Sequence, residues 1–310
     1  MTDVSGAPRL LCVGDMDMDI ILRVPKPPGP DQKVDGERVL QCPGGMAANV
    51  AVAARRLGMP TRLLAAVGDD AMGAEARAAL ERERLDLDHL AVRPGAATFF
   101  CVIMVDDRGE KSLVKALSPA YLPRPEDLTP KAFDGIAHLH MTFTRHDLAL
   151  RAIELARAAG ATVSLDLEAA DLDSSGGSVR ALVEAVDLLF LSAQSRPAVE
   201  AAIGPVGDRA DRTVVTTMGD AGARVERGGR EVARLPGHTV PVTDTSGAGD
   251  AFAGAFLTAR LDGADDATAL RFANAAAALS VRAYGAQTGL PDRSEVGAFL
   301  DARTPKDTHA

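Results

Sequence analysis

The stretch TVPVTDTSGAGDAFAGAF, residues 239–256, decides the fold that we predict for this chain. Its first four residues are typical of a strand, and DTSGAG is typical of a turn. The apolar spacing of residues 250–261 predicts a helix that begins at Asp250. Gly247 and Gly249 let the backbone bend tightly and come close to a ligand. Because the N–H groups at a helix start favour an anion, the stretch predicts an anion-binding turn beside a carboxylate.

This carboxylate has two interpretations. An aspartate in the first turn of a helix is a common partner of the helix dipole, and Gly-Ala-Gly is a common tight turn. Alternatively, Asp250 accepts a proton from a hydroxyl that attacks a phosphorus atom held at the turn. The motif is not a P-loop, because no Lys-Ser/Thr pair follows the glycines, and it lacks the GxGxxG spacing of a dinucleotide site.

Buried-strand patterns alternate with amphipathic helical patterns along most of the chain. This alternation predicts an α/β fold with a mostly parallel sheet. The strands are predicted at residues 9–15, 61–70, 136–141, 161–167, 186–192 and 212–219, and the helices at 46–58, 74–85 and 148–160.

Two segments, approximately residues 20–43 and 97–118, interrupt this alternation. They alternate polar and apolar residues between turns that contain proline or glycine, which predicts short antiparallel strands of a small, half-exposed sheet. Because the segments are separated in the sequence, we predict a lid inserted into a single domain that covers residues 1–310. Edge hairpins without functional motion are the alternative.

The composition narrows the function classes. The net charge of -9 argues against a nucleic-acid or membrane surface. Three scattered cysteines form neither a disulfide framework nor a CxxC metal site, and they are expected to be reduced thiols. The sequence shows no signal-peptide pattern and no apolar run of membrane-spanning length. We therefore expect a cytoplasmic protein without a nucleic-acid or membrane partner.

The wider sequence resembles the PfkB (ribokinase-like) family of carbohydrate kinases. DTSGAGDAFAGAF is similar to its C-terminal signature, and CPGGMAANVAVAARRLG is similar to its N-terminal signature. Four further motifs follow the order of the family: VGDMDMD, AAVGDDAMG, VVTTMGDAGA and FANAAAALSVRAYGAQTGLP. The resemblance implies a doubly wound α/β domain with a small β-sheet lid, and a kinase that uses ATP and Mg²⁺.

The resemblance also implies roles for individual residues. Asp250 is expected to be the catalytic base, with Gly247, Ala248 and Gly249 as the anion hole. The sugar side of the site is expected to contain Asp17, Asp19, Gly44, Gly45, Met46 and Asn49. Asp17 stands where ribokinases usually have asparagine, and a solvated turn residue is the alternative for it.

The same resemblance places the nucleotide and a candidate cation. Nucleotide-binding positions are expected at Thr217, Gly219, Gly222, Ser192 and Asn274. Asp244, Ser246 and Gly285 correspond to positions that often build a monovalent-cation site in relatives, with K⁺ as the candidate ion.

The sequence departs from the family pattern on the magnesium side. Many members carry Asn-x-x-Glu where this chain has Ser192 and Ser195, although Glu168 could contribute. Magnesium is usually held mainly by nucleotide phosphates and water, so the loss of that motif need not abolish activity. The substitution and the neighbouring SLDLE segment are similar to the ketohexokinase-like and sulfofructose-kinase-like branches, which favours a ketose or a modified sugar.

The acceptor side contains a second departure. Met46 replaces a lysine or asparagine, and a thioether is a poor hydrogen-bonding group. Lys33, Lys115 and Arg145 are expected near the acceptor, where converging cations would select an anionic sugar. Solvated surface cations are the alternative.

These observations predict an ATP-dependent kinase that phosphorylates a primary hydroxyl of a ketose or of a modified or acidic sugar. A nucleoside kinase of the same fold is one alternative, which Met46 would suit. A non-catalytic protein that senses sugars or nucleotides is the other. The exposed strands of the lid favour a homodimer that forms lid to lid.

Overall fold

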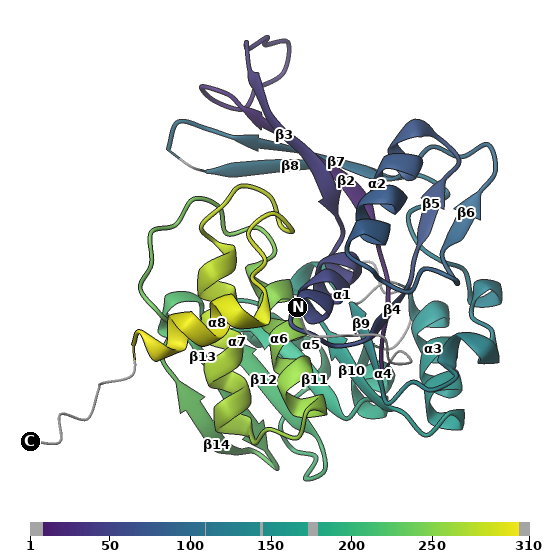
Figure 1. Cartoon of the computed structure of the whole chain (residues 1–310), viewed down its shortest axis with the longest axis vertical. Coiled ribbons are helices and arrows are strands. Elements are labelled where there is room, and N and C mark those ends of the chain that lie inside the picture. Colours follow the sequence, from purple (N-terminus) through teal and green to yellow (C-terminus); the bar gives the residue numbers. More distant parts are fainter. Residues whose placement is uncertain (1–8, 109, 143–144, 173–178, 304–310) are drawn as a thin grey trace, which may run out of the picture.

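A computed structural model describes residues 9–108, 110–142, 145–172 and 179–303 (Figure 1). The main sheet has eight strands in the order β14-β13-β12-β11-β10-β9-β1-β4. The six strands from β12 to β4 are parallel, and β13 and β14 add an antiparallel hairpin at one edge. Their bounds are β1 Leu10–Val13, β4 Thr61–Leu64, β9 His138–Thr142, β10 Thr162–Asp166, β11 Leu188–Ser192, β12 Thr213–Thr217, β13 Ala223–Arg227 and β14 Arg230–Leu235.

Helices cover both faces of this sheet (Figure 1). Successive side chains of β1 point to opposite faces, so Cys12 packs in one core and Leu11 in the other. The first core contains residues of α1, α6 and α7, and the second contains residues of α3, α4 and α5. The helices are α1 Met46–Arg56, α2 Ala71–Arg82, α3 His146–Ala158, α4 Val179–Ala185, α5 Arg196–Ile203, α6 Ala248–Leu261, α7 Asp266–Ser280 and α8 Arg293–Asp301. The doubly wound α/β fold is confirmed.

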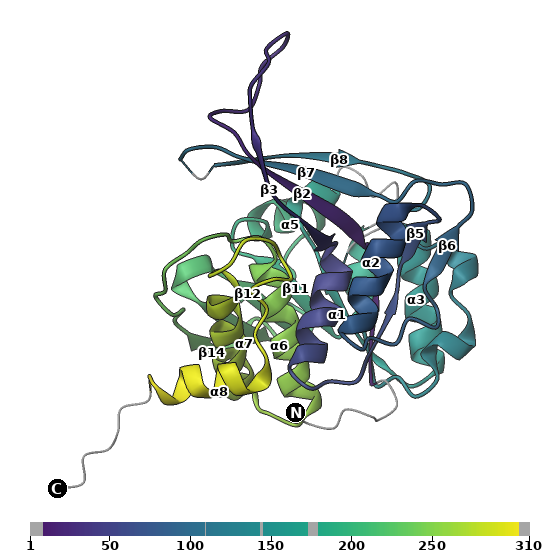
Figure 2. The same cartoon turned by 45° about the horizontal axis from the view of Figure 1, so that its top comes forward.

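The two interrupting segments form a separate sheet that projects over one edge of the domain (Figure 2). Its strands are β2 Asp17–Arg23, β3 Glu37–Gly44, β7 Phe100–Val105 and β8 Lys111–Ala116, in the order β3-β2-β7-β8. Each segment contributes an antiparallel hairpin, as predicted, and the two hairpins join through a parallel pairing of β2 with β7. The small sheet is therefore consistent with the predicted lid.

Two predicted strands are wrong. Residues 61–70 do not form one strand: β4 ends at Leu64, and β5, Ala66–Gly68, pairs with β6, Ala91–Arg93, in a sheet of its own. Residues 239–242 form no strand, because Pro241 cannot donate a backbone hydrogen bond.

Among the helices that the structure describes, none is long and apolar enough to cross a membrane.

Candidate active site

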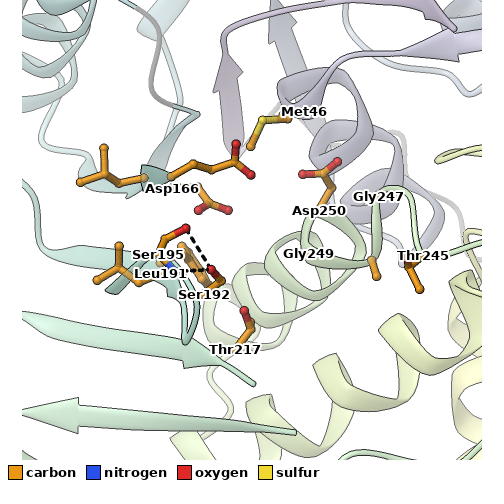
Figure 3. Close-up of a pocket in the computed structure, with 14 residues that line it drawn as sticks. Met46, Asp166, Leu191, Ser192, Ser195, Thr217, Thr245, Gly247, Gly249 and Asp250 are labelled. Carbon is orange, nitrogen blue, oxygen red and sulfur yellow. Dashed lines mark hydrogen bonds between the residues drawn. The ribbon is translucent and has the colours of Figure 1, made fainter. Parts of the chain in front are cut away.

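The glycine-rich turn opens α6 at one end of a cavity of about 290 Å³ (Figure 3). The helix begins at Ala248, two residues earlier than predicted, because Gly247 adopts the left-handed conformation of the N-cap with φ 71°. A Cβ at Gly247 would lie 2.7 Å from the Cβ of Ala286, whereas one at Gly249 would meet no atom within 4 Å. Gly247 therefore makes the turn possible, and Gly249 keeps space open in front of the first helical N–H groups.

Asp250 is buried in the first turn of α6 and lines the same cavity. Its Oδ2 accepts a hydrogen bond of 2.8 Å from Nδ2 of Asn49 on α1. The Oδ1 of Asn49 in turn accepts one of 3.0 Å from Nε2 of Gln287, which is also buried. This chain of side-chain hydrogen bonds fixes the orientation of the carboxylate, a requirement for positioned proton transfer.

Close packing of α1 against α6 makes the contact between Asn49 and Asp250 possible. A Cβ at Gly254 of α6 would lie 2.8 Å from the Cβ of Ala53 and 2.8 Å from the carbonyl oxygen of Val50. Only a glycine lets the two backbones approach this closely. The small residues of the two signature motifs thus hold the two helices at hydrogen-bonding distance.

Burial raises the pKa of Asp250 well above its ordinary value, and the charges of Asp166, Asp15 and Glu168 add to this effect. The hydrogen bond from Asn49 acts in the opposite direction, because it stabilises the ionised carboxylate. Asp250 is therefore a stronger base than an exposed aspartate.

The raised pKa predicts a displaced acid limb in the pH profile of kcat/KM. A base must be ionised, so activity should rise with pH only as Asp250 loses its proton, at a pH well above the value near 4 of an ordinary aspartate. In Asn49→Ala the stabilising hydrogen bond is lost, and the acid limb should move to higher pH still. Initial rates between pH 4 and 9 at saturating nucleotide test this. An acid limb near pH 4, or one that the variant leaves in place, contradicts it.

Asp17 and Asp19 lie side by side at the start of β2, and both are buried. A Cβ at Gly44 would lie 2.4 Å from Oδ1 of Asp17 and 2.4 Å from Oδ2 of Asp19, so this glycine makes room for the pair. Oδ1 of Asp17 has no hydrogen-bond partner among the described residues, whereas its Oδ2 accepts from the Cys101 thiol at 3.2 Å. A free, buried acceptor suits a ligand hydroxyl.

Like charges accumulate around this pair. Burial, Asp19 and Asp15 raise the pKa of Asp17 well above its ordinary value, and burial, Asp15 and Asp244 raise that of Asp19 to about 6. Oδ1 of Asp15 accepts a 3.1 Å hydrogen bond from the backbone N–H of Ala47, near the start of α1.

A second cavity, of about 450 Å³, continues from the first and shares Thr217, Thr245, Ala248 and Gly249 with it. Its wall is mainly apolar, which suits a flat heterocycle. It contains the predicted nucleotide positions Gly219, Gly222 and Asn274. Nδ2 of Asn274 donates to the carbonyl oxygen of Pro236 at 3.0 Å, so this side chain also shapes the wall of the cavity.

The wall opposite Asp250 is acidic (Figure 3). Asp166 and Glu168 line it beside Ser192, whose Oγ donates to Oγ of Ser195 at 3.0 Å. Burial and the charges of Glu168 and Asp171 raise the pKa of Asp166 to about 7. Carboxylates beside a phosphate site suit the hydrated Mg²⁺ that accompanies a nucleotide.

The three cations predicted near the acceptor have different surroundings. Lys33 lies in the exposed loop between β2 and β3. Arg145 precedes α3, where it pairs with Asp147 at a half-exposed position. Lys115 lies opposite Cys101 in the lid, and its charge lowers the pKa of Asp17. Of the trio, Lys115 has the clearest influence on the sugar side.

The proposed cation positions converge. Oδ2 of Asp244 accepts a hydrogen bond of 2.9 Å from the N–H of Gly285, and its Oδ1 accepts one of 2.9 Å from the N–H of Ser246. Nζ of Lys111, a lid residue, donates to the same Oδ1.

Four side chains at the site were missed by the sequence analysis: Asp15, Asp166, Gln287 and Lys111. A carboxylate at the carboxyl end of a parallel strand was an available signal for Asp15, after β1, and Asp166, at the end of β10, because ligands bind at that edge of such sheets. Gln287 contacts Asn49, which is 238 positions away in the sequence, and Lys111 contacts Asp244, which is 133 positions away. The sequence gives no local signal for such distant contacts.

Comparisons with known proteins find relatives that match nearly the whole chain. The family model described as pfkB family carbohydrate kinase matches residues 7–293. The ATP-dependent ribose-1-phosphate kinase of Halopiger xanaduensis is 34% identical over 95% of this chain and 99% of its own length. The ribokinase of Haemophilus influenzae is 30% identical, over 94% and 98%. The crystal structure of the Methanocaldococcus jannaschii nucleoside kinase superposes with a TM-score of 0.83 at 22% identity, covering 96% of this chain and 100% of that one.

Proposed function

Because the chain belongs to the pfkB family of carbohydrate kinases, we propose that it transfers the γ-phosphoryl group of ATP to the primary hydroxyl of a sugar that bears an anionic substituent. At the coarser level the protein is an ATP-dependent sugar or nucleoside kinase, a transferase that phosphorylates a hydroxyl. One observation carries the finer proposal. The buried, hydrogen-bonded Asp250 lines the first cavity directly after Ala248 and Gly249, which line both cavities.

The chemistry follows from this placement. Asp17 and Asp19 accept hydrogen bonds from sugar hydroxyls and so direct the primary hydroxyl toward Asp250. Asp250 takes the proton of that hydroxyl as its oxygen attacks phosphorus. The N–H groups from Gly247 to Gly249 stabilise the charge that develops on the phosphoryl oxygens. Closure of the lid over the sugar excludes water, which would otherwise compete as the acceptor.

The acidic wall suits a magnesium–nucleotide complex. Asp166 and Glu168 are the residues that would hold the ion through its water shell, in place of the Asn-x-x-Glu motif. Bound magnesium neutralises charge on the phosphates. In this proposal Ser192 and Ser195, which bond to each other, shape the wall.

The anionic substituent is inferred from Lys115. The sugar side carries at least three carboxylates, and Lys115 is the lid cation whose charge acts on Asp17. The ammonium group of Lys115 would bind the phosphate of the sugar on the lid side, away from the carboxylates of the pocket, which repel it. The ribose-1-phosphate kinase relative supports this, because its named substrate is a phosphorylated sugar. The relatives reported above do not favour the ketohexokinase-like or sulfofructose-kinase-like branch, which stays a prediction.

A substrate panel tests the proposal. ADP release should be fastest with ribose 1-phosphate or another anionic sugar, and slower with ribose, ketoses and nucleosides. Lys115→Ala should lower kcat/KM for the anionic sugar by about tenfold or more, the loss of roughly one charge-assisted hydrogen bond. The same variant should leave kcat/KM for ribose nearly unchanged. Equal losses on both sugars, or a preference for neutral sugars in the native enzyme, would remove the anionic substituent from the proposal.

Two alternatives remain as outcomes of the panel. Fastest turnover of a nucleoside would identify a nucleoside kinase, and the apolar Met46 on the cavity wall suits that substrate. Tight binding without ADP release would identify a sensing protein, although the retained Asp250 and its hydrogen bonds favour catalysis.

We also propose a homodimer that forms through the lids, in a cytoplasmic protein. The outer residues Leu113, Val114 and Leu117 are 51%, 55% and 66% exposed. A sheet whose edge strand β8 exposes apolar side chains is suited to pair with a second copy along that edge.

A further inference from the structure

A buried carboxylate joins three parts of the molecule just before the anion-hole turn. The side chain of Asp244 is 5% exposed. It accepts hydrogen bonds from the N–H of Ser246 in its own turn and from the N–H of Gly285 in the loop beside Ala286. Its third partner is Nζ of Lys111 in β8 of the lid. The position of this turn therefore depends on a contact made by the lid.

The Lys111 ammonium also reaches the hydroxyls of the turn. It donates to Oγ of Ser246 at 2.8 Å and lies 3.5 Å from Oγ1 of Thr245. The Lys111 side chain is only 31% exposed, although Lys111 belongs to an edge strand. An ammonium group has three donors and no acceptor, and here these donors point at three consecutive residues, 244–246.

These contacts do not fit a bound monovalent cation. K⁺ would need the oxygens of Asp244 and Ser246, and Lys111 already donates to Oδ1 of the first and to Oγ of the second. The remaining carboxylate oxygen accepts from the N–H of Gly285, whose donor hydrogen repels a cation. The positions implied by the family resemblance are thus brought together, but around an ammonium group.

The charge of Lys111 affects both sides of the active site. Burial alone would raise the pKa of Asp244, but the hydrogen bonds from Lys111, Gly285 and Ser246 lower it below its ordinary value. The same ammonium opposes the rise in the pKa of Asp19, to which Asp244 contributes. Without a positive charge here, two buried carboxylates would repel each other beside a site that must also bind phosphates.

We propose that Lys111 is a built-in replacement for the monovalent cation. Its ammonium group, which the lid carries, supplies the positive charge that holds the 244–246 turn in place. The enzyme therefore needs no K⁺. Lys111 is a positioning residue in this scheme, because it acts through Asp244 and Ser246 on the turn that leads into the anion hole. The inference concerns the turn and the lid, and it does not depend on which sugar is phosphorylated.

The test compares the native protein with Lys111→Met in K⁺-free tetramethylammonium chloride and in KCl at equal ionic strength. The native rate should change by less than twofold between the two salts. Lys111→Met should be at least tenfold slower in tetramethylammonium, and KCl should restore most of that loss, because the freed oxygens of Asp244 and Ser246 can then bind the ion. Lys26→Met, which removes an exposed lid cation, should behave as the native protein does.

A readout without substrate separates this inference from the proposed function. KCl should raise the melting temperature of Lys111→Met relative to tetramethylammonium chloride, and it should leave that of the native protein unchanged. Several results would overturn the inference: activation of the native protein by K⁺ of twofold or more, full activity of Lys111→Met without K⁺, or a loss that KCl does not reverse. In the last case Lys111 serves only the structure of the lid.

Discussion

Asp250→Asn is expected to lower kcat by about 10²- to 10⁴-fold, the usual contribution of a positioned general base. The amide keeps the shape of the side chain and can still accept the hydrogen bond from Asn49, but it cannot take a proton. The dissociation constant of ATP should change little, because the anion hole is built from backbone groups. Steady-state rates and calorimetric ATP titrations measure the two quantities. A variant that keeps full activity excludes Asp250 as the base.

The stability of Asp250→Asn distinguishes lost chemistry from lost folding. The raised pKa of Asp250 means that the folded state binds this proton more tightly than the unfolded chain does. The stability of the native protein should therefore fall as the pH rises from about 4 through the raised value. The variant lacks this loss, so its melting temperature at pH 8 should equal or exceed that of the native protein. A clear drop would attribute the lost activity to misfolding.

Gly44→Ala is expected to lower kcat/KM for the sugar by about 10- to 100-fold. The new Cβ would lie 2.4 Å from each of the carboxylates of Asp17 and Asp19, so both must move. Overpacking of this kind costs about 1–3 kcal/mol. The displaced atoms are those that we assign to the sugar, so the loss should appear as weaker sugar binding, with the affinity for ATP unchanged. Kinetics with each substrate varied in turn measure this.

Gly297→Ala is the matched control. A Cβ at Gly297, inside α8, meets no atom within 4 Å. This variant should have native kinetics and gain up to about 1 kcal/mol of stability, because alanine favours a helix interior. If Gly44→Ala behaves like this control, the assignment of the aspartate pair to the sugar site is wrong.

Much of the fold could be predicted because its signals are local. The alternation of strands and helices identified most strands of the main sheet and its parallel character. Gly58, the last residue of the predicted helix 46–58, has a positive φ just after the C-cap of α1. The predictions of strands at residues 61–70 and 239–242 were wrong because an apolar pattern alone does not show which strand a segment can form hydrogen bonds with. Residues 239–242 contain valines at strand spacing, but Pro241 prevents a regular ladder.

The site could be predicted only in part, for a related reason. Gly44, Gly247 and Asp250 lie within short motifs whose composition reflects close packing and a helix start. The partners that hold these motifs come from far along the chain. No periodicity links Lys111 with Asp244, because their contact depends on how the lid lies over the turn. Such contacts become visible only when the fold is known.

The central claim is that Asp250 activates a primary sugar hydroxyl for attack on ATP. Phosphorus NMR of the product formed from ATP and the preferred sugar tests it most directly, with native protein and Asp250→Asn compared. We predict a new phosphate ester whose phosphorus couples to the two protons of a CH₂ group, formed by the native protein and nearly absent with the variant. Release of inorganic phosphate alone, an ester on a secondary hydroxyl, or equal product from both proteins would contradict the account.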